Sequence, residues 1–256
     1  MQSKLMYAII GDICGSRFER PLAKKQLNIS SNDVENLINK DCKFTDDTVH
    51  TIALAAAIIE NKSNPDFAKH IRIWSKKYPN AGYGGRIRRW IYGDGPNDSF
   101  GNGAYMRISP VYWAYDPYWQ KAMMSKSIAC THDHPCSYLF IDYIINHKDI
   151  GITQSQKDLI SGKITIEDYH NYYHFDSSCQ GSVPESIYVA NHSNSYVECI
   201  KNAILLGGDT DTQAAIAGGI YGYKTKEKIP EDLYNWAWDL LSEEIREILN
   251  KFEELL

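Results

Sequence analysis

Two stretches of similar construction decide the fold of this chain. Residues 44–59 read FTDDTVHTIALAAAII, and residues 207–220 read GGDTDTQAAIAGGI. Each begins with hydroxyl and carboxylate side chains, which cap a helix and complement the positive end of its dipole, and each continues as a run of mostly apolar residues. Alanine and glycine are frequent in both runs, so two such helices could pack closely. The pattern predicts two helices with acidic starts.

Helical periodicity also dominates the rest of the sequence. Apolar residues recur at intervals of three and four over residues 66–78 and 196–206, and over residues 230–256, where we expect one amphipathic helix. Alternating strand patterns are scarce, and no repeat or linker divides the chain. We therefore predict a single all-α domain over residues 1–256.

Composition excludes several functional classes. The 27 Lys and Arg residues against 32 Asp and Glu give a formal net charge of −5, which argues against general nucleic-acid binding. No apolar run approaches the roughly 20 residues of a membrane span, and the N-terminal apolar run ends at Gly11-Asp12, so we expect a cytoplasmic protein without a membrane partner. Six scattered cysteines without a CxxC pair indicate reduced thiols.

Two segments differ from the helical body. Residues 83–110 are rich in Gly, Asn and Asp, and residues 146–178 are polar, with clusters of His and Tyr. Both are expected to form loops or short helices, and long loops in a compact domain commonly carry function.

The two acidic helix starts also predict a metal site. If the helices meet near their N-termini, four carboxylates come together, namely Asp46, Asp47, Asp209 and Asp211. Their repulsion and desolvation would be severe without cations, whereas one cap needs only one oxygen. Oxygen ligands of this kind suit Mg²⁺ or Mn²⁺, with hydroxyl groups as neutral ligands from Thr45, Thr48 and Thr212. Structural capping remains the alternative for each segment alone.

Four motifs follow one another along the chain. They are GDICGSRFE at residues 11–19, TDDT at residues 45–48, GNGAYMR at residues 101–107, and the start of residues 207–220. In this order and spacing they resemble the motifs of the ADP-ribosylglycohydrolase family, the group typified by dinitrogenase reductase-activating glycohydrolase. The resemblance covers nearly the whole chain.

The resemblance implies an orthogonal multi-helix fold that holds two divalent cations, Mg²⁺ or Mn²⁺, in a cleft for ADP-ribose. One cation would be held by Thr45, Asp46, Asp47 and Asp211, and the other by Asp209, Asp211 and Thr212, with Asp211 bridging. The implied catalytic carboxylates are Glu19, Asp47 and Asp211, with Glu19 beside the second cation as a ligand or as the group that activates water. The implied reaction removes ADP-ribose from a modified acceptor, with ADP-ribosyl-arginine on protein as the leading substrate.

The candidate substrate-binding residues are Gly84, Gly101, Asn102, Gly103 and His132, which the resemblance implies, together with the aromatic residues Phe100 and Tyr105. The Gly-Asn-Gly loop would bring backbone N–H groups close to the pyrophosphate, with an ordinary turn as the alternative. Phe100 and Tyr105 could stack on adenine or pack as ordinary aromatic residues. His132 would contact a ribose or a phosphate.

Other features allow more than one interpretation. The segment Cys130–Cys136 is dense in Cys and His, but its spacing fits no standard zinc site. Asp94 and Asp98 could act as an acid or a base, or be solvated turn residues. A basic cluster, formed by Arg86, Arg88 and Arg89, could meet phosphate or a protein substrate, or be a solvated helix face.

Two other functions remain possible on the same scaffold. One is a non-catalytic ADP-ribose-binding or structural protein, and the other is a two-metal phosphohydrolase that acts on a nucleotide. Binding without turnover would identify the first, and release of phosphate or AMP the second. We expect a monomer in each case.

Overall fold

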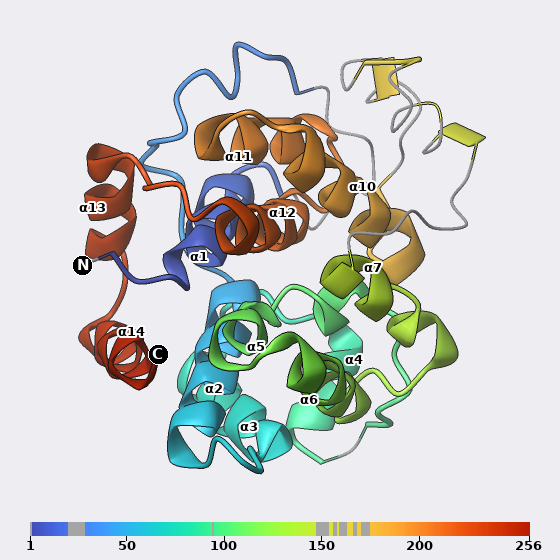
Figure 1. Ribbon diagram of the computed structural model, residues 1–256, viewed down its shortest axis with the longest axis vertical. Helices are drawn as coiled ribbons and strands as arrows, with labels where there is room; N and C mark the ends of the chain where they lie inside the picture. Colours follow the sequence, from blue (N-terminus) through green and yellow to red (C-terminus); the bar gives the residue numbers. More distant parts are fainter. Residues whose placement is uncertain are drawn as a thin grey trace.

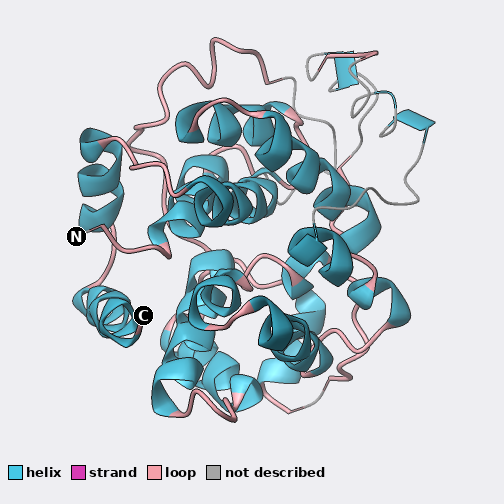
Figure 2. Ribbon diagram, viewed as in Figure 1, coloured by secondary structure: helices cyan, strands magenta, loops and turns pink. Residues whose placement is uncertain are grey.

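Helices dominate the part of the chain that the computed structural model describes, which comprises residues 2–19, 29–93, 95–146, 154–155, 158, 163–165, 168–169 and 175–256. The α-helices are α1 (Met6–Ser16), α2 (Asp46–Glu60), α3 (Phe67–Lys77), α4 (Gly85–Ile91), α5 (Ser109–Ala114), α6 (Pro117–Ala129), α7 (Ile141–Asn146), α10 (Cys179–His192), α11 (Tyr196–Leu205), α12 (Thr210–Thr225), α13 (Glu231–Asp239) and α14 (Glu243–Leu255). Two short 3-10 helices are η1 (Asn102–Ala104) and η2 (Pro135–Tyr138). Within the described residues, β-pairing is limited to isolated bridges, so the predicted all-α class is confirmed (Figure 2).

Helices α1 and α12 pack against each other at the centre of the fold (Figure 1). At one end of the contact, a Cβ added to Gly15 would lie 2.4 Å from the Thr210 carbonyl oxygen, and at the other end a Cβ added to Gly218 would lie 2.4 Å from the Tyr7 carbonyl oxygen. Real Cβ atoms do not approach so closely, so this contact requires glycine at both positions. The pairing also makes the helices antiparallel, which places the end of α1 beside the acidic start of α12.

Helix α2 is the second buried helix. It packs against α3, α5 and α14, and every residue from Asp47 to Ile58 is buried. A helix that is apolar all round is typical of such an interior position. Its start lies near the end of α1, so the two predicted acidic helix starts lie on either side of α1.

The predicted helices over residues 66–78 and 196–206 correspond to α3 and α11. The prediction of one helix over residues 230–256 is wrong, because the chain breaks between α13 and α14. Ser242 caps the second helix by accepting a hydrogen bond from the Ile245 backbone N–H, and two glutamates follow in the first turn. These local start signals outweigh the continuous apolar spacing.

Two predictions about the whole chain can be compared with the described part. No helix within the described ranges is long and apolar enough to cross a membrane. All six cysteines are free thiols. Most of residues 146–178, and Asp94, lie outside the described residues.

Candidate active site

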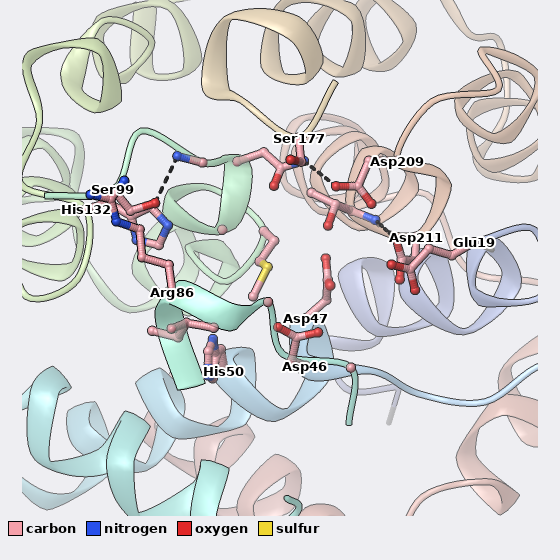
Figure 3. Close-up of a pocket in the computed structure, with 18 of the residues that line it drawn as sticks. Glu19, Asp46, Asp47, His50, Arg86, Ser99, His132, Ser177, Asp209 and Asp211 are labelled. Atoms are coloured by element: carbon pink, nitrogen blue, oxygen red, sulfur yellow. Dashed lines mark hydrogen bonds between the residues drawn. The ribbon is translucent and has the colours of Figure 1, made fainter. Parts of the chain in front are cut away.

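A cavity of about 350 Å³ lies where the starts of α2 and α12 meet the loops that precede α4 and η1. Its volume lies within the roughly 300–1,000 Å³ typical of small-molecule sites. Figure 3 shows that its two ends differ in charge. Carboxylates gather at one end, namely Glu19, Asp46, Asp47, Asp209 and Asp211, and the other end holds Arg86, Ser99 and His132.

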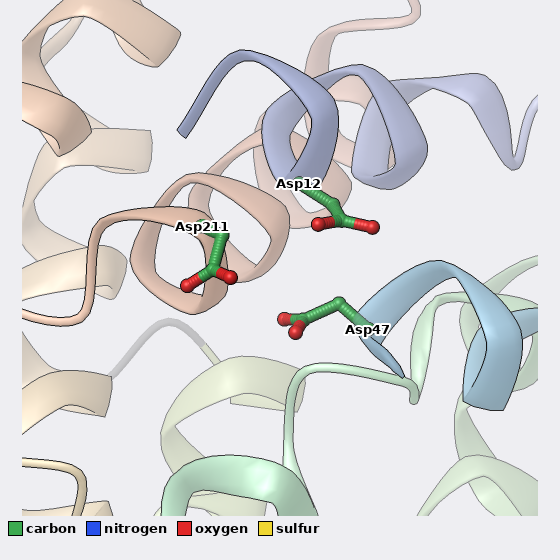
Figure 4. Close-up of side chains that lie close together, drawn as sticks. All are labelled: Asp12, Asp47 and Asp211. Carbon is green, nitrogen blue, oxygen red and sulfur yellow. The ribbon is translucent and has the colours of Figure 1, made fainter. Parts of the chain in front are cut away.

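Two groups of carboxylates meet at the acidic end. The first carboxylate group is Asp12, Asp47 and Asp211, which come from α1, α2 and α12 (Figure 4). The second carboxylate group is Glu19, Asp209 and Asp211. Within each group, one oxygen of every member lies within 4.8 Å of the others. Asp211 belongs to both groups, so its carboxylate stands between them.

Asp12 is a member of this site that the sequence analysis did not assign. It is fully buried, and its carboxylate accepts hydrogen bonds from Thr45 N at 2.9 Å, Thr45 Oγ1 at 2.7 Å and Thr48 N at 3.0 Å, with a further one from the Thr48 hydroxyl. Thr45 is the N-cap residue of α2 but makes no cap hydrogen bond with its own side chain. Asp12 therefore caps α2 from another helix. Glu19 follows the end of α1 by three residues, so helical spacing gave no signal that it would lie near Asp12.

Burial raises the pKa of the carboxyl groups in this cluster. The pKa of Asp47 and that of Asp211 lie well above the ordinary aspartyl value, first because of desolvation and then because of neighbouring negative charge. Burial and the charges of Asp12 and Glu19 raise the pKa of Asp46 to about 8. The same direction holds, with burial as the largest cause, for Asp12, Glu19 and Asp209. The described residues provide no Lys or Arg ion pair to these carboxylates.

The remaining residues expected to bind metal lie around the two groups. Thr45 Oγ1 lies 3.2 Å from Asp47 Oδ2 and 3.4 Å from Asp211 Oδ2, at the centre of the first group. Thr212 lines the cavity, and its backbone N–H donates to Asp211 Oδ1 at 2.8 Å. Asp46 lines the cavity but belongs to neither group; its Oδ1 faces Gly82, where an added Cβ would lie 3.2 Å away.

The Gly-Asn-Gly loop contacts the acidic end of the cavity through the side chain of Asn102. Asn102 Nδ2 donates to Asp209 Oδ2 at 2.7 Å and to Ser182 Oγ at 3.1 Å. The backbone N–H of Asn102 donates to the Ser177 carbonyl at 2.8 Å, and that of Gly101 donates to Ser99 Oγ. These two N–H groups are therefore occupied within the protein, whereas all three residues of the loop line the cavity, and contact of the loop with a pyrophosphate stays a prediction.

The two aromatic residues that we expected near adenine do not line the cavity. Tyr105 is buried, donates to the Ser137 carbonyl at 2.8 Å and packs edge-on against Phe140, so it belongs to the core and does not line the cavity. Phe100 is 47% exposed and lies beside His134, outside the cavity lining. Among the described residues, the Phe, Tyr or Trp side chain that lines the cavity is Phe175. Phe175 lies in a polar segment of the sequence, which gave no signal that its side chain would line the cavity.

The other end of the cavity is formed by residues that the sequence partly predicted. Gly84 lines the cavity, and a Cβ added there would meet no atom within 4 Å. Arg86 also lines the cavity and donates to Asp98 Oδ1 at 2.9 Å. His132 is 6% exposed, and burial together with nearby cationic side chains lowers its pKa well below the ordinary histidine value. The imidazole is therefore neutral.

His50 is a second residue that the sequence analysis missed. It follows the acidic start of α2, lines the cavity and is 1% exposed. Its Nε2 lies 3.0 Å from Ser75 Oγ, and desolvation lowers its pKa well below the ordinary value. It stood in an apolar helical run, where a histidine gives no functional signal.

The segment Cys130–Cys136 does not form a metal site within the described residues. The thiol of Cys130 donates to the Ser127 carbonyl at 3.0 Å, and the groups of side chains close enough to hold a cation are the two carboxylate groups.

Comparison with known proteins identifies the family. A family model described as ADP-ribosylglycohydrolase matches residues 5–255. Among solved structures, one described as an "ADP-ribosylglycohydrolase-related protein complex" matches with a TM-score of 0.64 and 17% sequence identity, over 99% of this chain and 96% of that chain, which shows a shared fold. Comparison with curated proteins gives no significant match. Because the family match covers nearly the whole chain, the protein belongs to the ADP-ribosylglycohydrolase family of enzymes, which hydrolyse glycosidic bonds of ADP-ribose.

Proposed function

We propose that this protein is a binuclear, Mg²⁺- or Mn²⁺-dependent hydrolase that removes ADP-ribose from ADP-ribosylated arginine side chains of proteins. The observation that carries the proposal is the membership of Asp211 in both carboxylate groups. A carboxylate within reach of two neighbouring cation positions can bridge them, as in other two-metal hydrolytic sites.

The residues fit two hard divalent cations. All donor atoms are oxygens, which Mg²⁺ and Mn²⁺ prefer. Asp47 Oδ1 is buried and has no hydrogen-bond donor within the described residues, so an acceptor there lacks a partner. The raised pKa values give a further reason, because a buried anionic cluster is costly at neutral pH unless cations compensate it.

The contacts divide the cluster into ligands and supporting residues. Asp12 already accepts four hydrogen bonds from Thr45 and Thr48, three at Oδ2 and one at Oδ1. We therefore assign Asp12 to orienting Thr45 and the start of α2. The residues that would hold the cations are Thr45, Asp47 and Asp211 for the first, and Glu19, Asp209, Asp211 and Thr212 for the second.

The reaction can be written around the protein's own residues. Divalent cations held by these residues would supply positive charge to polarise ribose and water oxygens. Glu19 is the less buried member of its group, so it can take a proton from the attacking water and exchange it with solvent. The water oxygen bonds to C1″ of the distal ribose as the bond from C1″ to the guanidino nitrogen breaks, and that nitrogen takes up a proton from solvent, to which Glu19 releases the proton of the water. Asn102 keeps Asp209 oriented through its 2.7 Å hydrogen bond.

The charge distribution in the cavity supports arginine as the acceptor. Glu19 and Asp46 are partly exposed carboxylates at the acidic end, where a guanidinium group would be attracted. Arg86 and His132 lie at the other end, where a pyrophosphate would find a positive charge and a neutral imidazole.

The test is mass spectrometry of the products. With Mg²⁺ or Mn²⁺, arginine-ADP-ribosylated protein should release free ADP-ribose, while the same protein modified on serine serves as the matched comparison. Faster release from serine would overturn the arginine assignment. Tight ADP-ribose binding without turnover of any linkage would identify a binding protein, and release of AMP or phosphate a phosphohydrolase; either result would overturn the proposed activity.

A further inference from the structure

Arg107, the last residue of the GNGAYMR motif, is a fully buried cation. Its side chain is 0% exposed and forms no ion pair with a described carboxylate. Nη2 donates to the Ser127 carbonyl at 2.9 Å and to Thr131 Oγ1 at 2.6 Å, whereas Nε and Nη1 are buried without a hydrogen-bond partner within the described residues. A cation is costly to bury with so few partners, so the contact with Thr131 requires a functional explanation.

Thr131 connects this cation to His132. Thr131 is 2% exposed, and its Oγ1 lies 2.6 Å from His132 Nδ1. Arginine can only donate, so Thr131 Oγ1 accepts from Arg107 and its own proton remains available. Two acceptors are in reach of that proton, His132 Nδ1 at 2.6 Å and the sulfur of Cys130, and the ring nitrogen is the stronger acceptor. If Nδ1 carried a proton instead, Oγ1 would accept twice and the buried hydroxyl proton would be left with the weak acceptor Cys130 Sγ.

The direction of these hydrogen bonds determines which nitrogen of the His132 imidazole carries the proton. When Nδ1 accepts, the proton of a neutral histidine resides on Nε2. Nε2 has no partner within the described residues and faces the Gly-Asn-Gly loop, because a Cβ added to Gly103 would lie 3.2 Å from it and one added to Gly101 would lie 3.6 Å away. Since His132 lines the cavity, the two glycines leave Nε2 accessible to a bound molecule.

We propose that Arg107 and Thr131 are positioning residues that hold His132 as the Nε2–H tautomer, so that it donates a hydrogen bond to an acceptor oxygen of the substrate. The inference rests on the proposed function for the identity of that substrate, whose phosphate and ribose oxygens are the acceptors of this kind. A donor fixed in this way discriminates against a ligand that offers only a cationic or N–H group at this position.

The tautomer can be measured directly. In Mg²⁺-loaded protein labelled with ¹⁵N-histidine, long-range ¹H–¹⁵N spectra should show His132 protonated at Nε2 with Nδ1 as an acceptor, the signals being assigned by their loss in His132→Gln. Protonation at Nδ1 would overturn the proposal, whether or not the protein is active.

A matched pair of variants tests the positioning role. Thr131→Val keeps the shape but removes the hydroxyl, whereas Thr131→Ser keeps the hydroxyl. By calorimetry, Thr131→Val should bind ADP-ribose about tenfold more weakly than the wild type, whereas Thr131→Ser should bind it with wild-type affinity. In steady-state kinetics, Thr131→Val should raise KM by a larger factor than it lowers kcat. Equal affinity in the two variants would refute the positioning role, and if Thr131→Val does not fold, Thr131→Ala also removes the hydroxyl and gives the same comparison with Thr131→Ser.

Comparison of ADP with ADP-ribose shows whether the acceptor oxygen belongs to a phosphate or to the distal ribose. The same measurements also distinguish failure of the tautomer proposal from failure of the proposed function. A parallel loss of affinity for ADP would place the acceptor on a phosphate, and a loss confined to ADP-ribose would place it on the distal ribose. Failure of the proposed function is a different result, namely no release of ADP-ribose from modified arginine while the tautomer and the difference in affinity persist.

Discussion

Asp12 of α1 accepts hydrogen bonds from both the backbone N–H and the hydroxyl of Thr45, at 2.9 and 2.7 Å, and so caps α2 from a different helix. Replacing Asp12 by Ala leaves several buried donors without an acceptor. We expect this variant to lower the free energy of unfolding of the Mg²⁺-loaded protein by about 2–4 kcal/mol, measured by urea denaturation. The control is Asp66→Ala, which removes the exposed N-cap of α3 and should cost about 1 kcal/mol. Equal costs would show that Asp12 is an ordinary cap.

Asn102 should matter through Asp209. Removing its amide in Asn102→Ala frees Asp209 from its 2.7 Å donor, and we expect kcat/KM to fall about 10- to 100-fold, as for other residues that orient metal ligands. Ser182→Ala removes only the other partner of the same amide, so its loss should be smaller. If Ser182→Ala is as impaired as Asn102→Ala, the loop rather than Asp209 is responsible.

Asp211 belongs to both carboxylate groups, whereas Asp46 lines the same cavity but belongs to neither, so variants of the two residues can be compared. Asp211→Asn should abolish turnover and remove high-affinity Mg²⁺ binding in calorimetry, because both groups lose a member. The fold should persist, and in EDTA the variant should melt no lower than the wild type, since one repelling charge is gone. Asp46→Asn should keep the wild-type binding stoichiometry, as Asp46 belongs to neither group. Retained turnover in Asp211→Asn would remove the bridging role.

The metal-free protein should lose stability as the pH rises. A carboxyl whose pKa is higher in the folded than in the unfolded chain binds more protons when folded, so its stabilisation is complete below the unfolded pKa and is lost as the pH rises through the folded pKa. For Asp46 this window runs from about pH 4, the unfolded value, to about pH 8. Melting temperatures in EDTA should therefore fall across this range, and Mg²⁺ should reduce the fall. A flat or rising profile in EDTA would contradict the raised pKa values.

The two phenylalanines near the cavity should behave differently. Phe175 lines the cavity and Phe100 does not, so Phe175→Ala should weaken ADP-ribose binding about tenfold, whereas Phe100→Ala should leave it nearly unchanged. Calorimetry with ADP-ribose measures both. The reverse order would restore the role that the sequence suggested for Phe100.

The sequence by itself determined the local structure and the types of ligand. The acidic starts of α2 and α12, the helices at residues 66–78 and 196–206, and the all-α class follow from capping and from apolar spacing, which act between residues near in sequence. The break at Ser242 was also local, and its cap signal was readable beside the apolar pattern that concealed it. The expectation that carboxylates converge followed from the similarity of the two acidic starts.

Only the tertiary structure decided how these residues meet. The glycine contacts between α1 and α12 bring Asp12 and Glu19 to Asp211, which lies about 200 residues away in sequence. Asn102 turns toward Asp209, Tyr105 packs into the core and Phe175 reaches the cavity because of packing between distant elements. Helix periodicity indicates which face of a helix is buried, but not which partner it meets. For that reason the types of metal ligand could be predicted from the sequence. The capping of α2 by Asp12 and the tautomer of His132 could be inferred only from the tertiary structure.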